Sequence, residues 1–140
     1  MDPNKLTQKV REALSASQAI ARKHRHQSVD AEHLLLATLQ QPDGLAPRLL
    51  ARMQVPVPEF VGRLVQELDR LPQVSGDGAD QLYISGRLNR ILIQAQDGAE
   101  RLKDDFVSVE HLLIALAEDT ADAPSTKLFR EFGLTKDRLL

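Results

Sequence analysis

The apolar positions of this sequence follow a helical period rather than an alternating one. In two stretches they recur at spacings of three and four residues, as expected for a helix with one buried face. The first stretch contains Val10, Leu14, Ser17 and Ala21, and the second contains Leu88, Leu92, Ala95, Ala99 and Leu102. No run of alternating β-branched residues bounded by turns predicts a strand. The pattern therefore predicts an all-α fold.

The sequence also repeats itself once. A shift of 78 residues places residues 6–37 over residues 84–115 without a gap. Nine of these pairs are identical: Leu14/Leu92, Gln18/Gln96, Ala21/Ala99, Val29/Val107, Glu32/Glu110, His33/His111, Leu34/Leu112, Leu35/Leu113 and Ala37/Ala115. The period is too long for a solenoid and only two copies are present. The duplication therefore predicts a compact pair of units with pseudo-two-fold symmetry.

Each copy is predicted to contain four helices. Asp30 and Ser108 precede the two Glu-His-Leu-Leu segments, and their side-chain oxygens can cap a helix by accepting from its first N–H groups. The predicted boundaries are Gln40 and Glu118 for the ends of these second helices, Gln54 and Gly133 for the ends of the third, and Pro56 and Thr135 for the starts of the fourth.

These signals divide residues 1–140 into repeat one (5–70), a connector (71–82) and repeat two (83–140). The connector contains proline, glycine, serine and aspartate in close succession, which is typical of a flexible linker. The fourth helix of repeat two is cut off at Leu140, so we expect the chain to be the front piece of a longer protein. The predicted fold is two tandem four-helix repeats, the second truncated in its last helix.

Three segments of the chain resemble the double repeat at the N-terminus of Clp-type AAA+ unfoldases. They are Thr-Gln-Lys-Val-Arg-Glu-Ala-Leu at 7–14, Val-Asp-Ala-Glu-His-Leu-Leu-Leu at 29–36 and Val-Ser-Val-Glu-His-Leu-Leu-Ile at 107–114. The connector and the segment Ile-Ser-Gly-Arg-Leu-Asn-Arg-Ile-Leu at 84–92 are similar to the ClpB branch of that family. The resemblance implies a domain that recruits unfolded or aggregated polypeptides to an ATP-dependent disaggregase.

The resemblance also implies properties of the whole protein. In that family the AAA+ rings follow this domain, bind ATP and Mg, form a hexamer and cooperate with a DnaK-type chaperone. The domain itself is expected to hold no cofactor. Because residues 1–7 lack an apolar signal core, a cytoplasmic location is expected. The alternative is a ClpA- or ClpC-type domain that receives adaptor proteins and feeds a protease.

A client groove is implied along the long helix of repeat two and the start of its next helix. Client capture needs exposed apolar surface, because aggregates present unburied side chains. The walls of the groove fall near Gln94, Gly98 and His111, and Ile93 supplies apolar surface beside them. The full set of implied binding residues is Thr7, Glu32, Ile93, Gln94, Gly98, Asp104, Glu110 and His111.

Several of these residues also have a purely structural explanation. A carboxylate at Glu32 or Glu110 gains roughly 0.3–1 kcal/mol from a helix N-terminus, whether or not it holds a cationic group of a client. Thr7 and its match Ser85 can each cap a long helix. Asp2 competes for the first of these caps, because the proline after it suits a first helical turn.

The sequence contains no motif for an enzyme site. None of the seven glycines is followed by lysine, so the chain has no P-loop. It has no cysteine, which excludes disulfides, thiolate catalysis and cysteine metal sites. His33 and His111 lie beside leucines without a nucleophile or a paired acid, which favours packing over catalysis. We therefore expect a non-catalytic domain.

The charge and hydropathy of the chain disfavour two other classes of partner. The 18 basic and 20 acidic residues give a net charge of −2, without the basic excess typical of nucleic-acid binders. The run Arg-Lys-His-Arg-His at 22–26 is expected to be a solvated helix end rather than a metal site, because helical histidine ligands are usually spaced i,i+4. No stretch approaches the roughly 20 apolar residues of a membrane span.

Overall fold

The protein folds as two helical repeats. The computed structural model describes residues 2–74 and 81–140. Repeat one contains the 3-10 turn η1 (Pro3–Lys5) and the helices α1 (Gln8–Lys23), α2 (Ala31–Leu39), α3 (Leu45–Arg52) and α4 (Val57–Asp69). Repeat two contains α5 (Gly86–Arg101), α6 (Val109–Glu118), α7 (Pro124–Glu131) and α8 (Lys136–Leu139). The prediction of two tandem four-helix repeats is confirmed.

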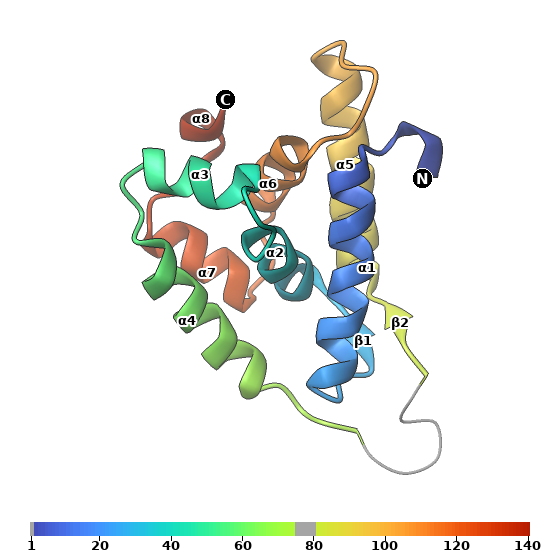
Figure 1. Ribbon diagram of the computed structural model, residues 1–140, viewed down its shortest axis with the longest axis vertical. Coiled ribbons are helices and arrows are strands. Elements are labelled where there is room, and N and C mark those ends of the chain that lie inside the picture. The colour runs from blue at the N-terminus through green and yellow to red at the C-terminus, as the bar shows by residue number, and fades with distance from the viewer. Residues whose placement is uncertain (1, 75–80) are drawn as a thin grey trace.

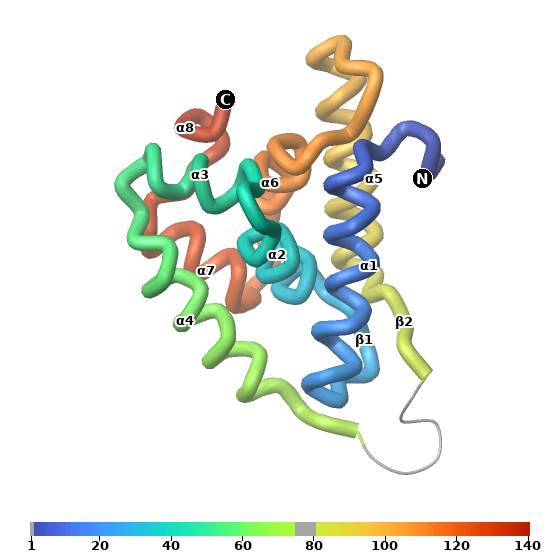
Figure 2. Tube along the Cα trace, in the orientation of Figure 1, coloured from blue at the N-terminus to red at the C-terminus, as the bar shows by residue number. Residues whose placement is uncertain are grey.

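The helices are arranged around α2. The long helices α1 and α5 lie along one side of the molecule, whereas α3, α4, α7 and α8 lie along the other (Figures 1 and 2). All nine residues of α2 are buried, while α1 and α5 each bury a single face. A helix that is buried on every side needs packing partners all round, and the two outer groups of helices provide them.

The two repeats interlock through their third helices. α3 of repeat one packs against α6 of repeat two, and α7 of repeat two packs against α2 of repeat one. The ring of Phe60 on α4 lies 6.3 Å from that of Phe129 on α7 and 5.2 Å from that of Phe132, measured between centroids. Because these contacts cross between the repeats, neither repeat buries its apolar face alone.

Two short parallel strand pairings join the repeats, and the apolar pattern does not predict them. Strand β1 (Ser28–Val29) pairs with β2 (Tyr83–Ile84), and Leu6 forms an isolated bridge with Val107. The pairing is exchanged, because the segment before each long helix pairs with the segment before the second helix of the other repeat. The expectation that strand signals are missing is therefore wrong for these residues: extended segments need partners for their backbone groups.

The predicted helix boundaries agree closely with the observed ones. The second helices end at Leu39 and Glu118, and the third helices end at Arg52 and Glu131, each within two residues of the prediction. Leu102 is an exception, since it was assigned to the buried stripe and is 52% exposed. It follows the last turn of α5 as the C-cap residue, where the chain is already leaving the core.

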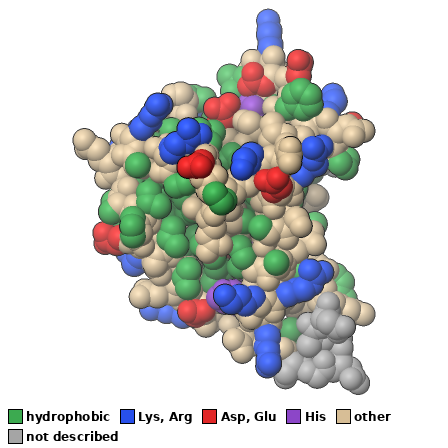
Figure 3. Space-filling view, in the orientation of Figure 1, with side chains coloured by type: hydrophobic (Ala, Val, Ile, Leu, Met, Phe, Trp, Pro, Cys, Tyr) green, Lys and Arg blue, Asp and Glu red, His purple; other side chains and the backbone are tan. Residues whose placement is uncertain are grey.

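The connector is described only in part, and the surface is mixed in polarity. Residues 75–80 of the predicted connector (71–82) lie outside the described residues. On the face shown in Figure 3, charged side chains lie mainly toward the two ends and hydrophobic ones show through the middle. Among the helices of residues 2–74 and 81–140, none is long and apolar enough to cross a membrane.

Candidate functional site

An open groove lies between α5, α6 and α8, with a volume of about 160 Å³. Its lining is partly apolar, through Leu102, Ile114 and Ala115, and carries charged side chains as well. The remaining lining residues are Gln94, Gly98, Arg101, His111, Glu118, Lys136 and Leu140. Leu102 is 52% exposed, so the groove offers apolar surface that is not covered by residues 2–74 or 81–140.

The structure brings together three of the residues implied for client binding. Gln94, Gly98 and His111 all line this groove. Ile93 is 46% exposed on α5 but is not among the lining residues. Glu110 is exposed on the first turn of α6, where a carboxylate remains free to meet a partner.

Gly98 leaves room in the groove wall. A Cβ atom added at this position would meet only the Arg101 guanidinium, at 3.8 Å, which is an ordinary contact. The matching residue of repeat one is Ile20, which packs partly buried against the core. The same helix position is therefore filled by a side chain in one repeat and open in the other.

His111 is held by hydrogen bonds at both ring nitrogens. Its Nδ1 accepts from the backbone N–H of Ser108 at 2.8 Å, which places the ring proton on Nε2. That Nε2–H donates to Oδ2 of Asp104 at 2.8 Å. The prediction that His111 is packed is confirmed, since the residue is 3% exposed. The expectation that no acid is paired with it is wrong, because Asp104 accepts from its ring and links α6 to the corner that precedes it.

Asp104, Glu110 and His111 are the one group in the described parts of the chain whose ligand atoms lie within 4.8 Å of one another, as a metal site requires. The donor set fits a metal poorly. A histidine that ligates through one nitrogen normally donates N–H from the other. In His111 the Nδ1 accepts from a backbone N–H instead, so coordination at Nε2 would sacrifice the helix cap. We interpret the group as a hydrogen-bonded corner.

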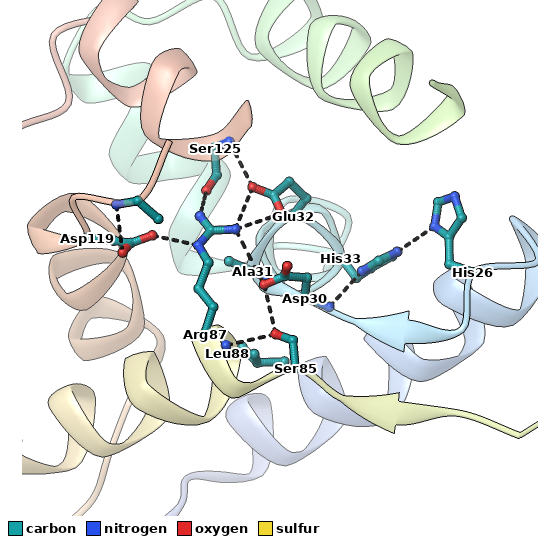
Figure 4. Close-up of polar contacts among 11 residues, drawn as sticks. His26, Asp30, Ala31, Glu32, His33, Ser85, Arg87, Leu88, Asp119 and Ser125 are labelled. Carbon is teal, nitrogen blue, oxygen red and sulfur yellow. Dashed lines mark hydrogen bonds and ion pairs between the residues drawn. The ribbon is translucent and has the colours of Figure 1, made fainter. Parts of the chain in front are cut away.

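The equivalent histidine of repeat one has a different partner. The Nδ1 of His33 accepts from the N–H of Asp30 at 2.9 Å, and its Nε2 lies 2.8 Å from Nδ1 of His26, as Figure 4 shows. His26 stacks on His24, whose Nδ1 is 3.2 Å from the carboxylate of Asp69. Three imidazoles thus form a chain from the surface to the start of α2.

Burial changes the protonation of this chain of imidazoles. Burial, and after it the charge of the neighbouring His26, lowers the pKa of His33 from its ordinary 6.5 to about 4. Burial, followed by the charge of His24, also lowers the pKa of His26. The prediction that residues 22–26 form a solvated helix end is wrong for His26, which is 5% exposed. The positive φ of Arg25, 57°, turns the chain so that the next side chain points inward.

Glu32 lies in a buried ionic cluster that crosses between the repeats (Figure 4). The Arg87 guanidinium lies 3.0 Å from the Glu32 carboxylate and 2.8 Å from that of Asp119, and donates to Oγ of Ser125 at 2.6 Å. The Glu32 carboxylate also accepts from the N–H of Ser125 at 2.9 Å. Burial lowers the pKa of Arg87, but Glu32 and Asp119 outweigh burial and raise it overall.

The cationic group that Glu32 holds therefore belongs to this chain. Glu32 is 2% exposed, and its oxygens are occupied by Arg87 and Ser125. A client could reach this carboxylate only by displacing them. Of the two matched glutamates, the structure exposes only Glu110.

Thr7 has the structural role that its sequence position suggests. Its hydroxyl accepts from the N–H of Val10 at 3.2 Å and caps α1, and Ser85 caps α5 in the same way through Leu88 at 2.9 Å. Asp2 does not displace Thr7, because it caps the separate turn η1. Thr7 is only partly buried, so this capping residue is also accessible at the surface.

Sequence reasoning missed Arg87, Asp119 and Ser125. Arg87 aligns with Lys9 in the repeat, and its partners lie 32 to 57 residues away along the chain. No local spacing signals such a cluster. The sequence offered one hint, which is that Arg87 directly precedes Leu88, the first residue of the buried stripe.

A family model described as the Clp repeat (R) N-terminal domain matches residues 5–132. The chain belongs to this family. The described groove and the two histidine-capped helices are therefore features of a Clp N-terminal domain.

Relatives of this Clp N-terminal domain are chaperones. The chaperone protein ClpB of Nitratidesulfovibrio vulgaris is 45% identical over 142 residues, which cover the whole chain and 16% of that protein. The ClpB of Bacillus anthracis is 41% identical with the same coverage. The predicted resemblance to ClpB is confirmed. This Clp N-terminal domain spans about one sixth of the length of these relatives.

Solved structures share the fold at lower identity. The N-terminal domain of Hsp104 from Candida albicans matches with a TM-score of 0.81 and 20% identity, covering 96% of this chain and 86% of that one. The N-terminal domain of the ClpV1 ATPase from E. coli matches with a TM-score of 0.82 and 23% identity, covering 97% of this chain and 82% of that one. At this identity the likeness concerns the fold of the Clp N-terminal domain.

Proposed function

We propose that this domain recruits unfolded or aggregated polypeptides to a ClpB-type disaggregase and that the α5–α6–α8 groove is where it holds them. The observation that carries the proposal is the open, partly apolar groove at Gly98, whose counterpart in repeat one is occupied by Ile20. Exposed apolar surface attracts unburied side chains through the expulsion of water. A shallow groove suits clients that differ in sequence.

The charged rim of the groove adds to this role. Arg101, Glu118 and Lys136 border the apolar lining, and Glu110 stands exposed nearby on α6. A client segment with apolar side chains and a cationic group would meet complementary surface at Leu102 and Glu110. Polar rims set register and exclude wrong partners more than they add affinity.

The role of the whole protein follows from the family and stays a proposal. The motor that follows this domain is proposed to be a hexameric AAA+ ATPase that uses ATP and Mg, works with a DnaK-type chaperone and acts in the cytoplasm. The domain itself is proposed to be non-catalytic and without a cofactor. The ClpB relatives support this assignment over the adaptor-docking domain of a ClpA- or ClpC-type unfoldase.

The test is a titration of the 1–140 chain with a permanently unfolded polypeptide, followed residue by residue through NMR chemical shifts. We expect weak, saturable shifts that cluster on α5 and α6 around Gly98 and His111, and none with a folded control protein. Shifts spread evenly over the surface, or none at all, would contradict the proposal.

A groove-filling variant sharpens the test. Gly98→Ile copies Ile20 of repeat one and should abolish the saturable shifts, because its side chain occupies the groove. Gly62→Ile on α4 is the matched control, since a Cβ at Gly62 has no neighbour within 4 Å and Gly62 lies outside the groove. Equal loss of binding in both variants would mean that the groove is not the binding site.

A further inference from the structure

Asp104 touches the wall of the groove without lining it. Its carboxylate is 2.8 Å from Nε2 of His111, and of these two residues only His111 belongs to the groove. The Asp104 side chain is 47% exposed, whereas that of His111 is 2% exposed. The Asp104 carboxylate thus contacts the buried His111 ring from the solvent side.

The His111 ring is fixed by two contacts of opposite polarity. The N–H of Ser108 donates to Nδ1, so only Nε2 carries a proton that can be donated to Asp104. The ring could flip only by losing both hydrogen bonds. A buried polar group left without its partner is unfavourable, so the pair keeps the ring in a single orientation along the groove.

The same contact fixes the corner between α5 and α6. Lys103 has a positive φ of 60°, and the backbone N–H of Asp104 donates to the carbonyl of Ala99 at 2.9 Å. The side chain of Asp104 then ties this corner to the first turn of α6 through His111. Arg101 and Leu102, which immediately precede the corner, form part of the groove lining.

We infer that Asp104 is a positioning residue for the client groove, which keeps His111 and the adjoining corner in place and does not hold the client by its charge. The inference rests on the proposed function and names how one of its residues acts. A bond from Nε2–H requires an acceptor oxygen at Asp104 and not a negative charge. The amide oxygen of an asparagine meets that requirement, and the methyl group of an alanine does not.

Repeat one offers a matched control. His26 is the residue equivalent to Asp104, it also follows a residue of positive φ, and it faces the capping His33 at 2.8 Å. This equivalent pair lies outside the groove lining. Loss of the His26 side chain therefore removes the same kind of link from the fold without altering the groove.

The experiment compares Asp104→Asn, Asp104→Ala and His26→Ala in the 1–140 chain. The dissociation constant for the unfolded polypeptide should rise about five- to tenfold in Asp104→Ala, which corresponds to the loss of about one hydrogen bond. It should stay within about twofold of the original value in Asp104→Asn and in His26→Ala. Ring ¹⁵N shifts should report the Nε2–H tautomer of His111 in the original chain and in both Asp104 variants, because the Ser108 N–H fixes it. The shift of Nε2 itself should change only in Asp104→Ala, where its acceptor is lost.

Several results would overturn the inference. Equal weakening in Asp104→Asn and Asp104→Ala would assign the effect to the charge of Asp104, and unchanged binding in both would remove any role in the groove. An unaltered His111 signature in Asp104→Ala would show that the ring does not depend on this contact. The ring signature is measured without a client, so it distinguishes failure of this inference from failure of the proposed function.

Discussion

The two repeats place the same side chains at the start of their second helices but connect them differently. In both, the capping histidine accepts from a backbone N–H and presents Nε2 to a corner residue. That residue is His26 in repeat one and Asp104 in repeat two. An imidazole can gain a proton that closes its acceptor site, whereas a carboxylate only accepts at neutral pH. Acid sensitivity is therefore expected of the His33–His26 pair of repeat one, where burial lowers the pKa of both rings.

The matched glutamates diverge in a similar way. Glu32 is enclosed with Arg87, whereas Glu110 is exposed and the residue matching Arg87 is Lys9, which lies 3.9 Å from Glu12 on its own helix. One carboxylate joins the two repeats and the other faces solvent.

The largest effect is expected from Arg87→Ala. It would leave the Glu32 carboxylate buried without its cation and lower the free energy of unfolding by about 3–5 kcal/mol. Urea denaturation followed by circular dichroism measures this change. The matched variant Lys9→Ala should change the value by less than about 1 kcal/mol, because its ion pair is exposed. A loss in Arg87→Ala no greater than in Lys9→Ala would contradict the difference between the sites.

The next effect is a loss of stability in mild acid. His33 titrates at its ordinary pKa of 6.5 in the unfolded chain and at about 4 in the folded one, so between these values the unfolded state binds more protons. The free energy of unfolding should therefore fall as the pH falls from about 6.5 to 4, by up to about 3 kcal/mol. Urea titrations at several pH values check this slope. A flat profile down to pH 4 would argue against the buried neutral imidazole.

Exchanging the corner residues should shift this acid sensitivity between repeats. His26→Asp gives His33 a carboxylate that accepts from Nε2–H and favours the protonated ring. The fall in the free energy of unfolding between pH 6.5 and 4 should therefore become smaller by about 1 kcal/mol. The reciprocal Asp104→His should make it steeper. The same urea titrations measure both variants. An unchanged slope in His26→Asp would mean that its source lies outside this pair.

The smallest effects concern two glycines in helices. Gly98→Ala and Gly62→Ala should each raise the free energy of unfolding by about 0.5–1 kcal/mol, because alanine favours a helix more than glycine does and both sites have room for a Cβ. Only Gly98→Ala should weaken client binding, by about twofold. Equal effects of the two variants on binding would contradict the special place of Gly98.

Much of the fold could be predicted from the sequence because it depends on local signals. Helical periodicity located α1 and α5, and the residues before the Glu-His-Leu-Leu segments predicted the caps of α2 and α6. The short strands could not be predicted in this way, since each two-residue segment carries no periodic signal. Leu102 was misassigned because a three-and-four spacing continues beyond the residue where the helix ends.

The candidate site was predictable only in part. The resemblance located Gln94, Gly98 and His111, which do share one groove. The sequence indicated that Glu32 and Glu110 were equivalent, but only packing between the repeats separated them, because a cation 55 residues away fills one site. His26 likewise looked solvated until the turn at Arg25 directed it inward.

By itself, the sequence determined the duplication, the helical class, the capping residues and the family. The helical class and the capping residues follow from contacts between residues close in the chain, whose preferences add up along each helix. The duplication and the family follow from similarity between sequences. The tertiary structure alone decided which of two identical side chains is buried, which histidine meets another histidine, and which helix face stays open. Such outcomes depend on distant partners brought together by the exchanged packing of the repeats, and no local pattern encodes those partners.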